Sequence, residues 1–368
     1  MQEEILRRLQ HQHKFLVEGK GHFMVFAEFT EDRHVDPPYE IPGQTGVLSE
    51  DFLKNHAYDL GIQAIRRIKT AFKNQMEIGD DSVPYPSYAG FTVDWGTGAT
   101  AALFSNGDVV FQEETSYSSR PIIKDWADLD DLVLSCDNRW FDYELQFWRG
   151  VLSEYEDTFP LVTHNYRSPL DYANDYRGTN IFLDLYDHPE EVKRLVDMCT
   201  EAIIECDRRI RDELPEMRSI PGGAWGVGIP APGMIFLNGD PVDLISNEQG
   251  EEFNTPYVER IIEYSGSLYF HHHSIGVSRA SSVAKIKGLT VQQIHQDPNG
   301  PKLCDYIDDN LIQASLKVPI DLGTPLNIQA KDFEATLEKL SHGRFIVRVQ
   351  APTRHEVKEL IKKIRSYS

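Results

Sequence analysis

The chain has 368 residues, of which 40% are hydrophobic and 26% charged, and its formal net charge at pH 7 is −21. An acidic field of this size repels phosphate backbones and anionic lipid, so we expect neither a nucleic-acid partner nor a membrane-surface partner. The opening residues MQEEILRRLQ have no apolar core of signal-peptide type. No apolar run approaches the roughly 20 residues that a membrane span requires.

The cysteines indicate a reducing environment. The chain has 4 of them, and they form no Cys-x-x-Cys pair. Cys199 and Cys206 fall on the apolar side of a helical pattern, so we interpret them as core residues. We expect a cytoplasmic protein.

Helical and strand-like segments alternate along most of the chain. Residues 80–120 are the exception, with short extended pieces joined by Gly and Asn turns. Helices are predicted at 3–18, 49–75, 188–214 and 255–266, followed by a last helix with a Thr353–Glu356 capping box. Strands are predicted at 21–29, 159–166, 222–230, 267–273, 289–295, 316–321 and 344–350.

This alternation predicts the fold. Strands separated by helices pair in parallel, and about eight of them in a chain of this length favour a closed (β/α)8 TIM barrel over an open sheet. No strand is followed by the glycine-rich loop of dinucleotide-binding or P-loop proteins. We expect one domain over residues 1–368, in which residues 1–85 form an N-terminal extension that caps the barrel mouth or packs on its side.

The segment SLYFHHHSIG, residues 267–276, places three consecutive histidines at the end of a predicted strand. Side chains alternate along a strand, so Tyr269, His271 and His273 share one face, which we expect to point into the barrel. Chemistry in such barrels occurs where strands end. We therefore interpret His271 and His273 as catalytic, and His272, on the opposite face, as structural.

Two histidines at i and i+2 of one strand can also bind a metal, and zinc accepts such nitrogen ligands. The next strand ends QQIHQDPNG, where His295 is the candidate third ligand and Asp297 a candidate catalytic carboxylate. Gln296 between them is a candidate substrate contact. The alternative is a metal-free site, because a histidine at a strand end is commonly a hydrogen-bonded structural group.

Other substrate-binding candidates lie at or after predicted strands. They are His164, Tyr166, Arg177, Trp225, Asp243 and Tyr269. The structural alternatives are surface ion pairing for Arg177, a core position for Trp225 and a helix cap for Asp243.

Several blocks of the sequence follow the order of a known family. SPLDYANDYRGTNIFLDLYDHPEEVKRLVD (168–197) carries an Arg-Gly pair and then Asp-Leu-Tyr-Asp-x-Pro-Glu-Glu-Val, and YFHHHSIG ends a strand. The blocks RPIIKDWADLDDL (120–132), ISNEQGEEFNTPYVERII (245–262) and IHQDPNGP complete the series over most of residues 90–300. In this order the chain resembles the uroporphyrinogen decarboxylase superfamily, which includes the tetrapyrrole decarboxylase and the cobalamin-linked methyltransferases.

The resemblance implies a (β/α)8 barrel with the active site at its C-terminal mouth. His273 and Gly276 match the family's His and Gly, but the Cys/Asp position between them is Ile275, which cannot bind a metal. The methyltransferases use that His and Cys, with a later Cys, to hold a zinc ion that makes a thiol a thiolate. His271 or His295 would have to substitute for the missing ligand here.

The decarboxylase branch fits less well, because PPYEIPGQTG (37–46) has no arginine where that branch has an arginine-containing run for substrate carboxylates. We interpret the chain as a methyltransferase-like enzyme of this superfamily that acts on a small methylated substrate. The resemblance suggests Zn²⁺ as cofactor and a corrinoid protein as partner. The alternatives are a metal-independent carboxy-lyase and a barrel that binds a ligand without catalysis.

Overall fold

The computed structural model describes residues 1–29, 49–84, 100–111, 117–118, 122–156, 159–297, 300 and 302–367. The segment 37–46 and most of the predicted extended pieces between residues 85 and 120 lie outside the described residues.

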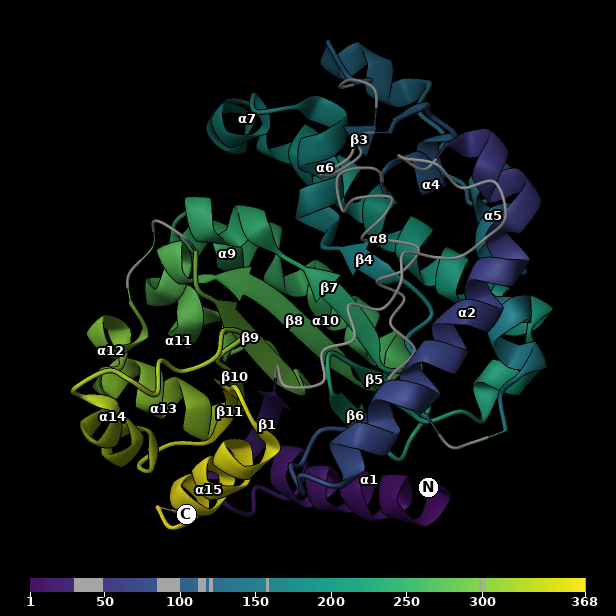
Figure 1. Cartoon of the computed structure of the whole chain (residues 1–368). Coiled ribbons are helices and arrows are strands. Elements are labelled where there is room, and N and C mark those ends of the chain that lie inside the picture. The colour runs from purple at the N-terminus through teal and green to yellow at the C-terminus, as the bar shows by residue number, and fades with distance from the viewer. Residues whose placement is uncertain are drawn as a thin grey trace.

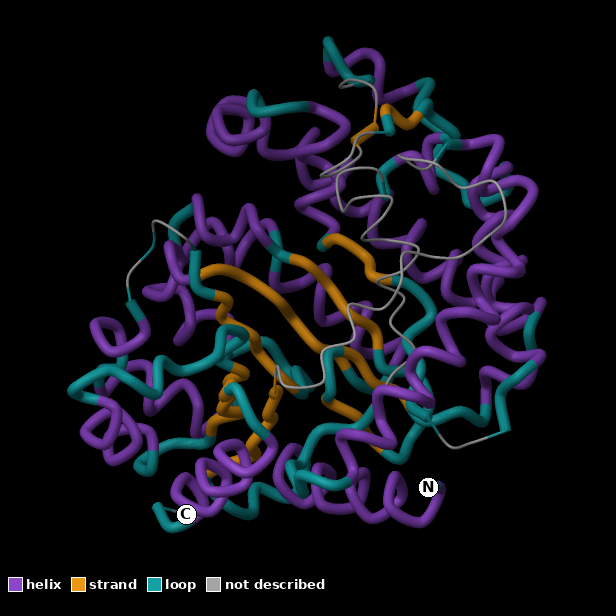
Figure 2. The backbone as a smooth tube through the Cα atoms, viewed as in Figure 1, coloured by secondary structure: helices purple, strands orange, loops and turns teal. Residues whose placement is uncertain are grey.

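Seven parallel strands form the central sheet, in the order β1-β11-β10-β9-β8-β7-β4 (Figures 1 and 2). They are β1 (Phe23–Phe29), β4 (Asn165–Arg167), β7 (Ile235–Asn238), β8 (Leu268–His273), β9 (Val291–His295), β10 (Ile320–Asp321) and β11 (Phe345–Ala351). Because all of these pairs are parallel, the carboxyl ends of the strands face the same end of the sheet.

The edges β4 and β1 are joined by irregular pairing. Leu161 pairs in parallel with Gly222 of the antiparallel hairpin β5 (Gly222–Ala224)–β6 (Val227–Ile229). At the hairpin turn, Val83 N–H donates to Gly226 O at 2.9 Å. Two residues earlier, Asp81 N–H donates to Val25 O of β1 at 2.8 Å. These contacts lead back to β1, and the result is the predicted TIM-barrel-like α/β fold.

The predicted strand at 222–230 is therefore a hairpin. Its turn consists of Trp225 (φ 57°) and Gly226 (φ 88°), both in the left-handed region that a two-residue hairpin turn of this hand requires. Trp225 is an unusual residue for that conformation, which explains why the sequence pattern did not predict a turn there.

Helices surround the barrel. They are α1 (Gln2–Leu16), α2 (Glu50–Met76), α4 (Ala102–Ser105), α5 (Arg139–Ser153), α6 (Pro169–Arg177), α7 (Ile181–Asp187), α8 (Pro189–Glu213), α9 (Asn247–Phe253), α10 (Thr255–Ser265), α11 (Ala280–Val283), α12 (Leu303–Tyr306), α13 (Asp309–Lys317), α14 (Phe333–Leu340) and α15 (Arg354–Arg365). The capping box of Thr353 and Glu356 is present at the start of α15. None of the helices described combines the length and apolar character that crossing a bilayer requires.

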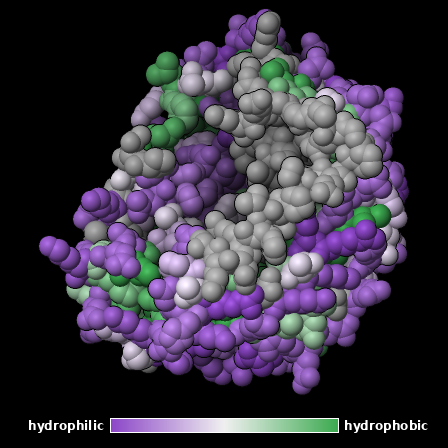
Figure 3. Space-filling view, viewed as in Figure 1, coloured by the Kyte–Doolittle hydropathy of each residue, from purple (hydrophilic) through white to green (hydrophobic). Residues whose placement is uncertain are grey.

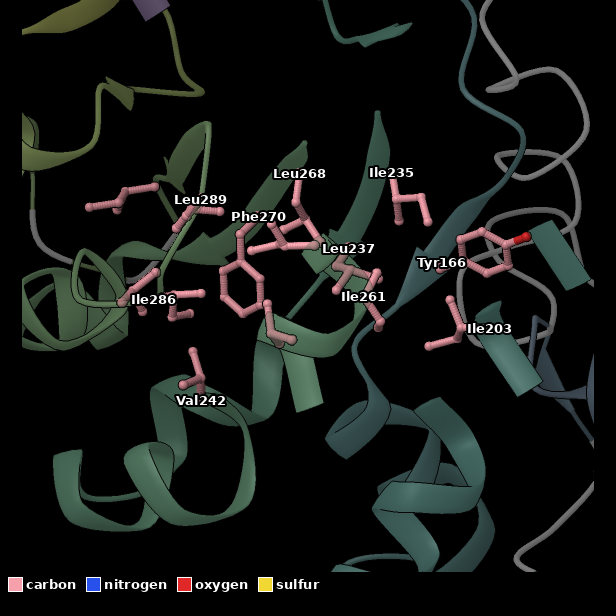
Figure 4. Packing of buried hydrophobic residues seen from close by; sticks show 14 of the residues in the cluster. Tyr166, Ile203, Ile235, Leu237, Val242, Ile261, Leu268, Phe270, Ile286 and Leu289 are labelled. Carbon is pink, nitrogen blue, oxygen red and sulfur yellow. The ribbon is translucent and has the colours of Figure 1, made fainter. Parts of the chain in front are cut away.

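The buried hydrophobic residues form two layers. Outward-facing residues of the strands, such as Leu237 and Phe270, pack against covering helices through residues such as Ile261 of α10 (Figure 4). A smaller inner cluster fills the amino end of the barrel and includes Met24, Phe236, Tyr269, Val291 and Ile346.

The described part of residues 1–85 contributes to the barrel itself. Phe15 and Leu16 of α1 pack into the inner cluster, so α1 covers the amino end of the barrel, along the lower edge of Figure 1. Strand β1 belongs to the sheet, and α2 packs on the outside against α5.

Close contact between α2 and α5 leads to a stability prediction. A Cβ added at Gly61 would lie 2.0 Å from Phe147 O, and one at Gly150 would lie 2.0 Å from Tyr58 O. Gly61→Ala should therefore force the helices apart and lower the free energy of unfolding by about 3 kcal/mol in urea denaturation. Thr70→Ala, at an exposed position of α2, is the control and should change it by less than about 0.5 kcal/mol. Equal stability of the two variants would contradict this packing.

Candidate metal centre at the barrel mouth

Strand β8 presents His271 and His273 to the barrel interior and His272 to the opposite face. The His271 ring stacks with Phe236 and Trp225, with ring centroids 6.2 and 6.0 Å away. His272 is fully buried, and its Nδ1–H donates to Asp243 Oδ1 at 2.9 Å. The alternation of side chains along the strand thus separates the three histidines as predicted.

Asp240 completes a group of three potential metal ligands with His271 and His273. One donor atom from each residue lies within 4.8 Å of the others. The Nε2 atoms of His271 and His273 are 3.2 Å apart, and His273 Nε2 lies 3.2 Å from Asp240 Oδ1. Asp240 begins the 3-10 helix η4 (Asp240–Leu244), immediately beyond the carboxyl end of β7. Neighbouring parallel strands therefore bring the three side chains together at the mouth.

Buried hydrogen bonds fix the protonation of His271. The carboxylate of Asp321 can only accept, so the Gln293 amide donates to Asp321 Oδ2 through Nε2 (3.3 Å) and directs its Oε1 toward His271. His271 Nδ1–H donates to that oxygen at 2.5 Å. The lone pair is therefore on Nε2, the atom that faces His273, and this is the tautomer that a metal ligand needs.

Asp321 is in turn held by Arg348 and Tyr269. Arg348 Nε donates to Oδ1 at 2.9 Å and its Nη2 to Oδ2 at 2.6 Å, and the Tyr269 hydroxyl donates to Oδ2 at 2.6 Å. Burial by itself would raise the pKa of Asp321, but the charge of Arg348 and these hydrogen bonds outweigh it and lower the pKa. The chain Arg348–Asp321–Gln293–His271 is thus a continuous hydrogen-bonded support for one ligand.

Asp243 supports the other histidine. Its Oδ2 accepts from His273 N–H at 2.7 Å. A Cβ at Gly276 would lie 1.8 Å from Asp243 Oδ1, so only glycine lets this carboxylate approach the strand end. Asp243 therefore positions the backbone at His273, and Gly276 makes room for it.

Asp297 and His295 lie beside the three potential ligands. His273 Nδ1 is 2.9 Å from Asp297 Oδ1. The ring centroid of His295 is 6.1 Å from that of His271 and 6.0 Å from that of His273. His295 thus borders the group, whereas Asp240 lies within it.

The ring environments shift the pKa values of the histidines in opposite directions. Burial lowers the pKa of His271 to about 4, whereas contact with Asp240 and the charge of Asp297 raise the pKa of His273 to about 8. Burial and the neighbouring His273 lower the pKa of His295. His271 is therefore neutral at pH 7, whereas His273 is protonated there and must lose its proton to bind a metal.

The residues fit a zinc ion. Two imidazoles and a carboxylate form a three-ligand set that leaves a fourth, open position, as in catalytic zinc sites. Asp240 Oδ1 is buried and lacks good hydrogen-bond geometry among the described residues, and its nearest partner is His273 Nε2, 3.2 Å away. Such unsatisfied polar atoms are uncommon in folded proteins and often mark the place of a ligand or ion. On the face shown in Figure 3, hydrophilic side chains gather along the left side of a central hollow.

Three predicted substrate contacts lie away from this group. His164 is fully buried and its Nδ1 is 2.8 Å from Glu144 Oε1 of α5, and Tyr166 is fully buried in the outer hydrophobic layer. Arg177 Nε donates to Asp184 Oδ2 at 2.6 Å and its guanidinium covers the Trp126 ring. These contacts support the α/β packing and leave none of the three side chains at the mouth.

Trp225 and Gln296 lie near the strand ends, whereas Tyr269 lies further inside. Trp225 stacks beside His271, and the Tyr269 hydroxyl lies deeper in the barrel, on Asp321. Gln296 N–H donates to the Thr324 hydroxyl at 3.1 Å. The sequence analysis did not predict Asp240 as a ligand. The residue stands two positions after the apolar run IFLN of β7, and this position just beyond a strand could have indicated it.

The strands, the covering helices and the strand-end ligands define the class of this protein, an α/β barrel of the TIM type with a candidate metal centre at its mouth. Among solved structures it is similar to a methyltransferase from Methanosarcina mazei, with a TM-score of 0.54 and 12% sequence identity over 88% of this chain and 92% of that chain. No family model and no curated protein sequence matches the chain. At this identity the similarity shows the fold alone, and membership of the uroporphyrinogen decarboxylase superfamily stays a prediction.

The support for His271 can be tested through Gln293. Gln293→Leu removes the acceptor that keeps the proton on His271 Nδ1, and zinc affinity should fall about 10- to 100-fold in a chelator-competition titration. Gln292→Leu is the matched control, because Gln292 is equally buried but donates to His272 on the other face (2.7 Å). A loss of zinc affinity of the same size in both variants would contradict the assigned role of Gln293.

Proposed function

We propose that this chain is a zinc-dependent methyltransferase in which Asp240, His271 and His273 hold the metal at the barrel mouth. The observation that carries the proposal is the three-ligand group, with its lone pair on His271 Nε2, at the carboxyl ends of β7 and β8. The fold, similar to that of a methyltransferase, supports the same reaction class. This ligand set accounts for the absence of a metal-binding side chain at Ile275.

Zinc, when bound, lowers the pKa of a coordinated thiol or hydroxyl, so that the group reacts as an anion at neutral pH. The residues of this chain bind and orient. Asp297, 2.9 Å from His273 Nδ1, stabilises the orientation of that ring, and Asp243 holds the His273 backbone. The Trp225 ring forms an apolar wall beside His271.

The carboxy-lyase alternative fits this site less well. Its substrate would carry a carboxylate, and His273 is surrounded by Asp240, Asp243 and Asp297. A substrate carboxylate would need a positively charged partner, and the guanidinium of Arg348 is already paired with Asp321. Negative charge at the mouth therefore favours a thiol or hydroxyl substrate over a carboxylate.

We further propose that the methyl group is exchanged with a corrinoid carried by a partner protein. The test uses methylcobalamin as donor and 2-mercaptoethanol as acceptor. In this reaction the S–C bond forms as the Co–C bond breaks, cobalt keeps the electron pair, and the thiol proton passes to solvent. We expect zinc-loaded protein to consume methylcobalamin and form the methyl thioether, and chelator treatment or His273→Ala to abolish this. Rates that do not depend on zinc would refute the proposal, and carbon dioxide release by chelator-treated protein from carboxylated pyrroles would favour the carboxy-lyase.

A further inference from the structure

A cavity of about 490 Å³ lies beside the candidate metal centre. It is lined by β1, α2, the β5–β6 turn and β11, and its walls include Phe26, Phe72 and Trp225. The ring centroids of Trp225 and His271 are 6.0 Å apart, so a single side chain separates the cavity from a metal ligand. The volume is typical of sites for small organic ligands.

Most polar side chains in the cavity wall are bonded to the protein itself. Gln75 Nε2 donates to Ala27 O at 2.6 Å and to Asp80 Oδ2 at 2.8 Å, and the Ser82 hydroxyl donates to the same carboxylate oxygen at 2.6 Å. Arg348 is engaged by Asp321 and by Trp225 O, to which its Nη2 donates at 2.8 Å. The surface offered to a ligand is therefore mainly aromatic and aliphatic.

The charges on the cavity wall are of both signs. Glu28 and Arg348 line it from neighbouring strands, and the guanidinium also lies over the Phe26 ring, 5.1 Å from its centroid. Because Asp321 already neutralises Arg348, the described residues of the cavity wall offer no unpaired cation to an anionic ligand. A neutral ligand avoids the desolvation cost that an ion would incur here.

Trp225 carries backbone strain that its position explains. A φ of 57° is strained for a residue other than glycine, and asparagine is the usual choice in this kind of turn. The turn places the indole with one side against Phe236 and His271, where it forms the wall between cavity and ligand. The strain is thus associated with an aromatic platform at the metal centre.

From these observations we infer that the cavity binds a neutral aromatic small molecule whose ring packs against Trp225, beside the metal centre. The inference rests on the proposed function, because it assigns the cavity to the substrate of that centre. A tetrapyrrole with many carboxylates is not the ligand expected by this account.

The test titrates zinc-loaded protein with three probes of one size: 2-naphthalenemethanol, 2-naphthoate and 2-naphthylmethylammonium. Calorimetry should show the neutral probe binding at least tenfold more tightly than either ion. Ala71→Trp, from an exposed position that lines the cavity, should reduce this affinity at least tenfold, and Thr70→Trp, one residue away and outside the lining, should leave it unchanged. In cobalt-loaded protein, the neutral probe should shift the visible absorption bands of the metal.

Tighter binding of an ion, or equal affinities in the two tryptophan variants, would overturn the inference. Zinc binding without any probe binding would overturn the cavity assignment and leave the proposed function standing. Probe binding that is sensitive to Ala71→Trp in a protein that binds no zinc would support the cavity and refute the metal-dependent function.

Discussion

Replacing His271 with alanine is expected to lower the affinity for zinc more than 100-fold. Among the three potential ligands, His271 has the most completely prepared lone pair, because Gln293, Asp321 and Arg348 hold its tautomer. Loss of a ligand should cost more than the roughly 10- to 100-fold loss typical of changes in outer-shell partners. Competition with a chromophoric chelator measures the constant, and thermal unfolding of the apo protein checks that the variant is folded.

His295→Ala provides the comparison, because His295 was the third ligand predicted from the sequence. Its ring centroid lies 6.1 Å from that of His271, outside the group that contains Asp240. We expect His295→Ala to change zinc affinity less than tenfold and Asp240→Ala to reduce it as strongly as His271→Ala. The reverse ranking of Asp240 and His295 would restore the ligand set predicted from the sequence.

Replacing Arg348 with methionine is expected to have the largest effect on stability. Asp321 is fully buried and the Arg348 side chain is 17% exposed, so the variant leaves a buried carboxylate without its counter-charge. Removal of one partner from such a pair typically costs about 3–5 kcal/mol. Urea denaturation at pH 8 should show a loss in this range. The double variant Arg348→Met, Asp321→Asn should recover most of it, because no buried charge remains.

The pH dependence of that loss tests the same pair. In the native protein the folded-state pKa of Asp321 is lowered. The pair therefore contributes its stability above the unfolded-state pKa and loses it as the pH falls through the folded-state value. Without Arg348, burial raises the pKa of Asp321, so protonation at low pH relieves the unpaired charge. The stability gap between the native protein and Arg348→Met should therefore be smaller at pH 4.5 than at pH 8. A gap that widens on acidification would contradict this assignment.

The local periodicities of the sequence were sufficient to predict the barrel-like fold and to place two of the three potential metal ligands together. Alternation of side chains in YFHHH placed His271 and His273 together and His272 apart, since that rule depends only on strand geometry. Asp240 was missed because the four-residue strand β7 was too short to stand out from its surroundings. The turn at Trp225 was missed because a tryptophan rarely occupies the left-handed region.

The supporting residues could not be predicted in the same way. Gln293, Asp321 and Arg348 lie on three different strands, and their contact depends on strand register, which no local pattern encodes. Arg177 was assigned to substrate from its place after a strand, but the helix that contains it turns its guanidinium toward Asp184. Side-chain pairing between segments distant in the sequence therefore determines both the support of His271 and the position of Arg177.

Anomalous diffraction from crystals of the zinc-loaded protein tests the metal centre most directly. The account predicts one strong peak at the zinc edge, about 2.0–2.2 Å from His271 Nε2, His273 Nε2 and a carboxylate oxygen of Asp240. A peak coordinated by other residues, or a map without a peak at the mouth of the barrel, would contradict it.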